Sequence, residues 1–259
     1  MSARSRRAHR ARGVGLQVAV VMAVLVAWKL GTEWADSLFF PPPNEVLSEV
    51  WNGWILDWSA TWTENLEPSL TRLLAGFLLA AVFAVSLGVA IGRSRTLGDY
   101  VEPIIHFVRS IPPPALLPLL LVLLGIGDDM KVVLIAVGVF PPILLNTADG
   151  VRSIDPLYLD TAAVYRIPRL RRLTRVILPA AAPQIFAGLR ISLSIAVILM
   201  VISELIAATN GVGFRILQAQ RQFKMVDLWA GLVVLGAMGA ALNAVLALIE
   251  RRVLRWRRT

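Results

Sequence analysis

Long apolar stretches alternate with short polar segments along most of the chain. Six of the stretches approach the length needed to cross a bilayer as a helix, about 20 residues. They lie at residues 14–30, 69–92, 104–127, 130–148, 183–208 and 228–249. The third and the fourth are separated only by GIGDD, so we expect these two spans to form a helical hairpin. The pattern predicts an all-α, polytopic membrane protein with about six transmembrane helices.

The positions of Lys and Arg predict the orientation, because cytoplasmic loops of membrane proteins carry an excess of these residues. With a cytoplasmic N-terminus, the inner segments hold 18 Lys and Arg and the outer segments hold 4. This distribution explains the net charge of +9 better than binding to nucleic acid does. We therefore expect a basic inner tail at 1–13, a transmembrane domain at 14–250 with an inner loop at 151–182, and a basic inner tail at 251–259.

The first predicted outer segment, residues 31–68, is acidic and rich in tryptophan. Trp51, Trp54 and Trp58 recur at helical spacing after a proline-rich stretch. Tryptophan rings settle at the interface between membrane and water. We predict a short helix at residues 44–58 that lies on the outer surface, with an ordinary packed loop as the alternative.

Prolines and charges interrupt the apolar spans at a few places. Residues 109–118 read RSIPPPALLP and residues 140–142 read FPP. Proline removes a backbone donor, and in lipid such breaks occur along transport pathways or where kinked helices pack. Both interpretations remain open. Glu204 lies about one turn inside the predicted outer end of the fifth span, where an isolated carboxylate is costly. It either lines a gate or accepts hydrogen bonds from nearby backbone donors.

Several enzyme classes lack support in the sequence. The chain has no cysteine and only two histidines, and it contains no P-loop, no H-E-x-x-H and no G-x-S-x-G. The spans also lack the series of carboxylates and histidines expected of a proton-coupled pump. If the chain transports a solute, we expect the energy to come from a partner.

The arginine-rich stretch DTAAVYRIPRLRRLTRVILP, residues 160–179, resembles the EAA loop of ABC importer permeases. The family pattern is E-A-A, three residues, G, nine residues and then I-x-L-P. The spacing is intact here, with Asp160, Thr161 and Ala162 at E-A-A, Arg166 at the glycine, and Val176, Leu178 and Pro179 at I-x-L-P. Arginine in the glycine position and D-T-A in place of E-A-A depart from the family pattern.

Further blocks extend the resemblance to nearly the whole chain from Pro41 onward. PPPNEV (41–46), SLTRLLAGF (69–77), the block at 109–155, GLRISL (188–193) and SELIAATNGVGF (203–214) resemble the nitrate, sulfonate and taurine branch of these permeases. The resemblance implies a type I importer in the bacterial cytoplasmic (inner) membrane, which imports a small anion or organic solute.

The resemblance also implies the partners of the chain. They are a second permease copy, two cytoplasmic ABC ATPase subunits that bind ATP and Mg, an extracytoplasmic solute-binding protein and membrane lipid. A single EAA-like loop makes a homodimer the simplest assembly, and a heterodimer with a related permease is the other possibility. The chain itself would be neither catalytic nor in need of a cofactor or metal. Rival interpretations are a secondary carrier or channel without an ATPase, and an intramembrane enzyme.

In this family the EAA loop is a coupling helix that docks on the ATPase, and spans three to five line the pathway. The resemblance therefore implies coupling residues Asp160, Thr161, Ala162, Tyr165, Arg166, Arg169 and Pro179. Candidate pathway residues are Arg109, Pro113, Phe140, Asn146, Arg190, Met200, Ser203 and Glu204. We expect little room for a bulky side chain at Ala162 once the loop has docked.

Overall fold

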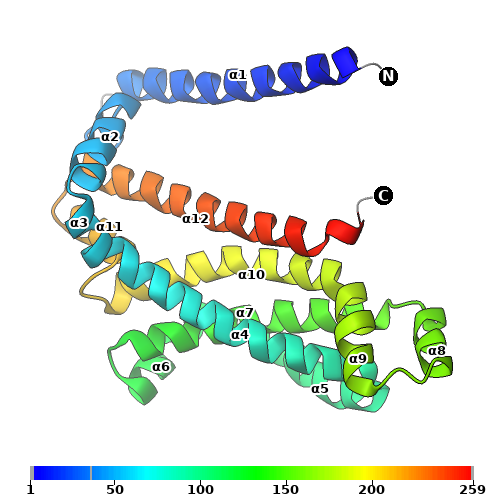
Figure 1. Ribbon diagram of the computed structural model, residues 1–259. Coiled ribbons are helices and arrows are strands. Elements are labelled where there is room, and N and C mark those ends of the chain that lie inside the picture. Colours follow the sequence, from blue (N-terminus) through cyan, green and yellow to red (C-terminus); the bar gives the residue numbers. More distant parts are fainter. Residues whose placement is uncertain (1–2, 36, 258–259) are drawn as a thin grey trace. The chain divides into compact units, whose positions relative to one another are not determined.

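A computed structural model of the chain describes residues 3–35 and 37–257, without the side chains of residues 3–15, 17, 18 and 257. Helices make up nearly all of the described residues, and no strand occurs among them (Figure 1). The chain divides into two compact units, residues 1–61 with 216–234 (unit 1) and residues 62–215 with 235–259 (unit 2).

Unit 1 contains the N-terminal helix and the predicted tryptophan-rich helix. Its elements are α1 (Ala3–Ala35), α2 (Pro43–Glu49), a π-helical segment (Val50–Ile55), α3 (Trp58–Thr61), and parts of α11 (Val212–Arg221) and α12 (Met225–Val253). The helix predicted at 44–58 is confirmed from Pro43 to Ile55, after which it ends. Trp51 and Trp58 are exposed and Trp54 is buried, so only part of the tryptophan set lies at the surface of the unit.

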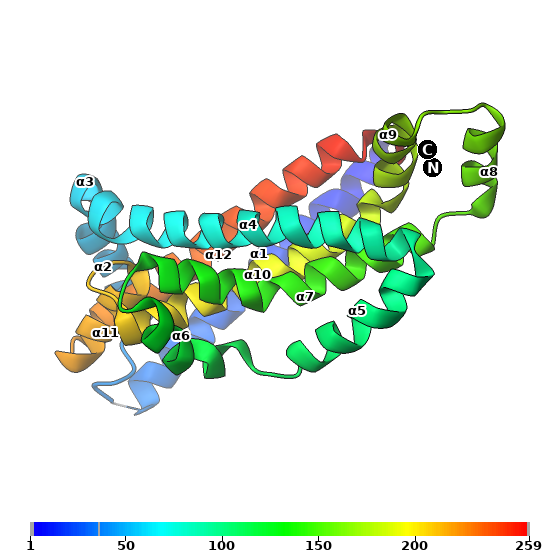
Figure 2. The ribbon, with the colours of Figure 1, turned by 90° about the horizontal axis from the view of Figure 1, so that it is seen from below.

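Unit 2 contains the remaining long helices. In chain order these are a π-helical segment (Trp62–Leu66), α4 (Glu67–Arg93), α5 (Arg95–Val108), a 3₁₀ turn (Pro113–Leu116), α6 (Leu117–Leu124), α7 (Asp128–Arg152), α8 (Pro156–Val164), α9 (Arg169–Arg172), a π-helical segment (Leu173–Ile177), α10 (Leu178–Ala207), the rest of α12 and a 3₁₀ turn (Arg255–Arg257). Helix α7 packs against both α4 and α10 (Figure 2). These three helices form the core of unit 2.

The apolar helices agree with the predicted spans, with one correction. Among the described residues, the helices long and apolar enough to cross a membrane are Trp58–Arg93, Asp128–Arg152, Arg169–Ala207 and Met225–Val253. The first predicted span, 14–30, lies within α1, and part of its side chains are outside the described residues. The predicted basic tails also extend outside the described residues, at 1–2 and 258–259.

The third span is not the single helix predicted at 104–127. Helix α5 begins earlier, at Arg95, and an 81° bend separates it from the segment Pro113–Leu124. Pro112, Pro113 and Pro114 lie at this break, where they lack backbone donors and disfavour a helix in the residues before them. The FPP sequence behaves differently, because α7 continues through it without a break.

Glycines allow α4 and α7 to approach each other closely. A Cβ atom added at Gly88 would lie 2.7 Å from the carbonyl oxygen of Leu144 and 2.7 Å from Cβ of Thr147. Small residues at such contacts are typical of membrane helices, whose association depends on close packing of their backbones.

The alanine variant of Gly88 should therefore destabilise the protein. We expect Gly88→Ala to lower the free energy of unfolding by about 1–3 kcal/mol, because helix backbones must move apart to admit the methyl group. Gly236 is a matched control, since an added Cβ there meets nothing within 4 Å. Thermal unfolding of both variants in one detergent checks this, and equal shifts would contradict the role of Gly88.

Candidate functional site

Helix α8 projects from one end of unit 2, opposite α6 and at the same end as the last turns of α12 (Figures 1 and 2). The sequence defines its start. Asp155 caps the helix, with its Oδ1 accepting a hydrogen bond from the backbone N–H of Leu157 at 2.9 Å, and Pro156 occupies the first turn. This segment is the first half of the predicted coupling loop.

The end of α8 explains the family glycine. The backbone N–H of Ile167 donates to the carbonyl of Ala162 and that of Arg166 donates to Ala163, each at 2.9 Å. This pair of bonds is a Schellman motif, whose residue after the cap adopts a left-handed conformation that favours glycine. Arg166 occupies that position with a φ of 52°. The side chain of Arg166 is exposed. Within this chain the residue therefore contributes through its backbone conformation and not through a side-chain contact.

Substitutions at Arg166 should follow backbone preference. A left-handed conformation costs a non-glycine residue about 1–2 kcal/mol, and β-branched residues tolerate it worst. We expect Arg166→Gly to retain transport and Arg166→Val to lower it clearly, as measured in reconstituted vesicles at equal protein content. If Arg166→Gly loses transport while Arg166→Val keeps it, the arginine side chain and not the turn is what matters.

The loop exposes a mixed apolar and cationic surface, which we call the α8 surface. Its apolar members are Leu157, Tyr158, Val164, Tyr165 and Leu170, all more than 60% exposed. The predicted coupling residues Asp160, Thr161, Tyr165, Arg166 and Arg169 are exposed beside them, and Pro179 is half-buried in the first turn of α10. Exposed apolar side chains next to arginines are typical of a protein-docking surface.

Ala162 differs from the other predicted coupling residues. It is 2% exposed, so the chain itself already covers it before any partner binds. The expected intolerance of a bulky residue at this position therefore has an internal cause, and a Trp at Ala162 would disturb the fold of the loop rather than test docking alone.

The base of the loop is packed onto the ends of all three core helices. Leu159 of α8 and Leu173 contact a cluster whose buried members are Val89 of α4, Val151 near the end of α7, Ile154 just after α7, Ile177 just before α10, and Ala181 and Ile185 in the first turns of α10. Leu159 is therefore the contact through which a displacement of α8 can reach these helix ends, since protein interiors are close-packed.

A buried polar cluster lies at the opposite end of unit 2. Glu204, in the last turn of α10, is 0% exposed. Ser69 of α4 donates its hydroxyl to Glu204 Oε1 at 2.8 Å, and Arg72 donates Nη1 to the same oxygen at 2.8 Å. The backbone N–H of Gly213 donates to Oε2 at 2.9 Å. Glu204 is thus an enclosed carboxylate with charged, hydroxyl and backbone donors.

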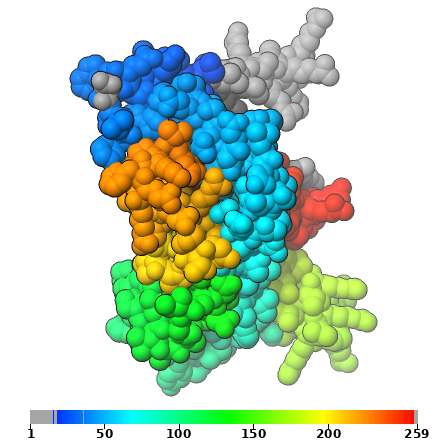
Figure 3. All heavy atoms as spheres, turned by 90° about the vertical axis from the view of Figure 1, so that its left-hand side faces the viewer, coloured from blue at the N-terminus to red at the C-terminus, as the bar shows by residue number. Residues whose placement is uncertain are grey.

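Arg72 extends the cluster to α7. Its Nε donates to Asp128 Oδ1 at 2.7 Å, and the same oxygen accepts from Lys131 Nζ at 3.2 Å. Its two terminal nitrogens also donate to the carbonyl and side-chain oxygens of Asn210. One guanidinium therefore joins α4, α7, α10 and the connection between α10 and α11. Figure 3 shows this end of unit 2 from outside, where the gold connection after α10 adjoins the cyan residues at the start of the unit and the green residues before α7.

Two glycines let the chain wrap around the Glu204 carboxylate. Gly211 has a φ of 111°, and a Cβ there would lie 2.5 Å from Cδ of Glu204. At Gly213 a Cβ would lie 2.8 Å from Cβ of Glu204. Ser69 completes the wrap by accepting a hydrogen bond from the backbone N–H of Val212 at 2.9 Å. Glycine is needed at 211 for both its conformation and its close approach.

The other predicted pathway residues are spread over unit 2. Arg109 is exposed at the break after α5, and Arg190 pairs with Glu250 of α12. Asn146 donates to the carbonyl of Pro142 at 2.8 Å within α7. The structure places the remaining four as follows: Pro113 at the break before α6, Phe140 half-buried in α7, and Met200 and Ser203 buried in α10. Only Ser203 and Met200 lie next to Glu204 along α10, so the structure does not gather the set into one site.

Ser69, Asp128, Asn210, Gly211 and Gly213 take part in the cluster, yet sequence reasoning did not select them. The signal was present in the blocks SLTR and SELIAATNGVGF, which hold most of them. Among the described residues, no group of three or more His, Asp or Glu is placed to hold a metal ion.

Comparisons with known proteins identify one family. Residues 72–259 match the family described as binding-protein-dependent transport system inner membrane component. The taurine transport system permease protein TauC of Escherichia coli (strain K12) is 34% identical over 95% of this chain and 90% of its own length. The bicarbonate transport system permease protein CmpB of Synechococcus elongatus is 30% identical over 94% of this chain and 90% of its own length.

A shorter match and a solved structure complete the comparison. The putative aliphatic sulfonates transport permease protein SsuC of Bacillus subtilis (strain 168) is 34% identical over 74% of this chain and 70% of its own length. The fold is similar to that of an inward-facing MetNI methionine ABC transporter, with a TM-score of 0.62 over 73% of this chain and 94% of that chain. At 19% identity this likeness concerns the fold alone.

Proposed function

The chain belongs to the family of binding-protein-dependent transport system inner membrane components, and from that premise we propose that it forms, with a second copy of itself, the translocation pathway of an ATP-driven importer. It is a permease component of the ABC importer class, with the predicted all-α fold of type I permeases. In the proposed complex, two cytoplasmic ATPases bind ATP and Mg, and an extracytoplasmic solute-binding protein delivers the solute in the bacterial inner membrane.

The main structural support for this proposal is the α8 surface. It presents apolar and arginine side chains to solvent, while its base packs onto the ends of α4, α7 and α10. A partner bound there can therefore move three long apolar helices at once. Such a contact is what alternating access needs, since ATP binding in one subunit has to change the packing of helices in another.

For the substrate, the relatives favour a small anion. Two of them are described as permeases for taurine and for aliphatic sulfonates, and a third as one for bicarbonate. We propose a small sulfonate or a similar anion as the solute, selected mainly by the solute-binding protein.

Copurification tests the proposal. The tagged chain is expressed with its partner subunits, solubilised in detergent and weighed by native mass spectrometry. We expect two permease copies with two ATPases, and ATP hydrolysis that rises when the loaded binding protein is added. A single permease that moves solute in vesicles without an ATPase would favour the secondary carrier or channel instead.

The proposed orientation makes a prediction of its own. The chain has no cysteine, so single cysteines can be labelled without background. We expect Ser153→Cys, exposed after α7, to react with an impermeant maleimide only in permeabilised cells. Ser48→Cys, exposed in α2, should react in intact cells and serves as the control. Reaction of Ser153→Cys in intact cells would place the α8 surface outside and overturn the topology.

A further inference from the structure

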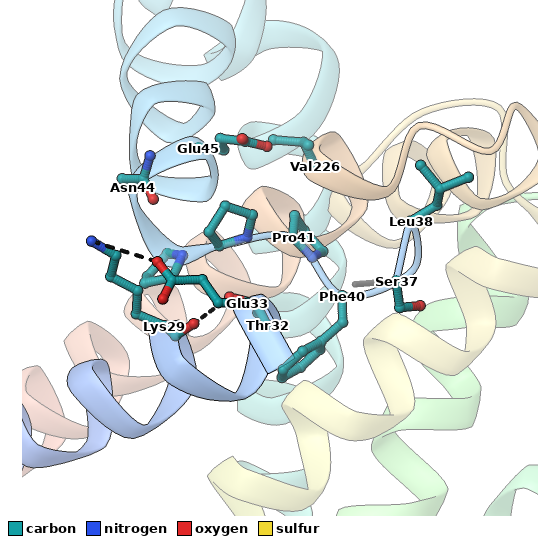
Figure 4. A pocket seen from close by; sticks show the side chains of 12 residues that line it. Lys29, Thr32, Glu33, Ser37, Leu38, Phe40, Pro41, Asn44, Glu45 and Val226 are labelled. Atoms are coloured by element: carbon teal, nitrogen blue, oxygen red, sulfur yellow. Dashed lines mark hydrogen bonds and ion pairs between the residues drawn. The ribbon is translucent and has the colours of Figure 1, made fainter. Parts of the chain in front are cut away.

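Unit 1 contains a pocket of about 810 Å³ between the end of α1, the connection to α2 and the first turn of α12 (Figure 4). Its polar lining residues are Lys29, Thr32, Glu33, Ser37, Asn44 and Glu45, and prolines, Phe40, Leu38 and Val226 supply the apolar wall. This volume is in the range of small-molecule sites. The transport mechanism proposed above does not use this pocket.

The residues around the pocket have the composition of a membrane interface. Along α1 the exposed apolar side chains include Val20, Val24 and Leu30, and the polar residues of the pocket begin at Lys29. Trp34, one turn further, is 91% exposed, and tryptophan is enriched at membrane interfaces. A lipid whose acyl chains run along α1 would therefore place its headgroup at the pocket.

The walls of the pocket are held in place before any ligand binds. Trp28 Nε1 donates to the carbonyl of Pro41, and Trp229 Nε1 donates to that of Phe39, each at 3.1 Å. The rings of Trp28, Phe40 and Trp229 also pack together, with centroids 5.3 to 6.4 Å apart. A fixed connection of this kind lowers the entropic cost of binding.

The charges of the pocket select the kind of headgroup. Lys29 and Glu33 face each other at 3.8 Å, and both side chains are largely exposed. A pair so long and so exposed is weak, so both groups remain available to a ligand. Among the described residues that line the pocket, Lys29 is the cation and Glu33 and Glu45 are the carboxylates, a balance that disfavours a purely anionic ligand.

We propose that this pocket binds the headgroup of a zwitterionic aminophospholipid. The primary ammonium donates hydrogen bonds to the carboxylates of Glu33 and Glu45, and the phosphodiester accepts from Lys29. A quaternary ammonium has no N–H group to donate, so a phosphatidylcholine headgroup loses these hydrogen bonds and keeps only the phosphate contact and a weaker charge attraction to the carboxylates.

The test uses native mass spectrometry of the full chain with equimolar phosphatidylethanolamine, phosphatidylcholine and phosphatidylglycerol. We expect the wild-type protein to retain about ten times more phosphatidylethanolamine than either of the other lipids. Two charge-assisted hydrogen bonds account for a difference of this size. Glu33→Gln with Glu45→Gln should remove this preference, because it weakens phosphatidylethanolamine binding more than phosphatidylcholine binding. Lys29→Gln should weaken both lipids alike. Glu67→Gln, an exposed carboxylate of α4 outside the pocket, is the matched control.

Each other outcome overturns the proposal. Equal retention of the three lipids, or a preference for phosphatidylglycerol, would exclude recognition of the ammonium group. Displacement of the lipid by soluble glycerophosphoethanolamine at the same concentration would show a site for a free solute instead. Because no step requires ATP or transport, the result is independent of the proposed import function.

Discussion

Glu204→Ala should lower the free energy of unfolding by about 3–5 kcal/mol, which is the usual cost of removing one partner of a buried ion pair. Arg72 is 3% exposed and would remain in place without its enclosed counter-ion. Ser69 and the backbone N–H of Gly213 would also lose their acceptor. Unsatisfied buried donors add to the cost of the charge.

The effect should be specific to the pair of charges. Ser203 is an equally buried neighbour of Glu204 whose hydroxyl donates only within α10, to the carbonyl of Met200 at 2.7 Å. We expect Ser203→Ala to cost less than about 1 kcal/mol. In a double-mutant cycle, Glu204→Ala and Arg72→Leu should be non-additive by about 1 kcal/mol or more, because either change alone already breaks the contact.

Chemical or thermal unfolding in detergent measures these differences, together with transport per folded molecule. Additive costs, or a Glu204→Ala variant as stable as Ser203→Ala, would show that the cluster does not hold the helices together. A stable variant that loses transport would favour the other interpretation of Glu204, as a residue that lines a gate.

The hydropathy pattern predicted the long helices of unit 2 because about 20 consecutive apolar residues have few alternatives to a membrane span. It missed the start of α5 because Arg95, Asp99 and Glu102 make that end polar and hide it from a search for apolar runs. Ser94 is a residue type that often caps helices, and in the structure its hydroxyl accepts a hydrogen bond from the backbone N–H of Leu97 at 3.3 Å.

The charged cluster shows where reasoning from sequence stopped. Glu204 stood out in the sequence as a costly carboxylate near the outer end of its span, but nothing there identified Arg72 as its partner. The contact of α4 with α10 and with the connection after Ala207 depends on tertiary packing. No periodicity in the sequence specifies that packing. For the same reason the burial of Ala162 could not be read from its small size.

Tyr165→Asp should weaken binding of the partner ATPase by about tenfold or more, if the α8 surface is the docking site. Tyr165 lies at the end of α8 and is 77% exposed. Aromatic anchors often dominate protein interfaces, and a carboxylate in their place would be buried without a partner. The fold itself should be unaffected, because the side chain has little contact with its own chain.

Phe223→Asp is the matched control, since Phe223 is also aromatic, exposed to 74%, and located in unit 1 between α11 and α12. Retention of the ATPase on the tagged chain and ATP hydrolysis stimulated by the loaded binding protein are measured for both variants. Tyr165→Phe should keep both, because it retains the aromatic ring that the proposed docking contact buries. Loss of the ATPase with Phe223→Asp but not with Tyr165→Asp would place the docking site elsewhere. Equal retention by both would remove the central argument for α8 as the element that links ATP hydrolysis to the movement of α4, α7 and α10.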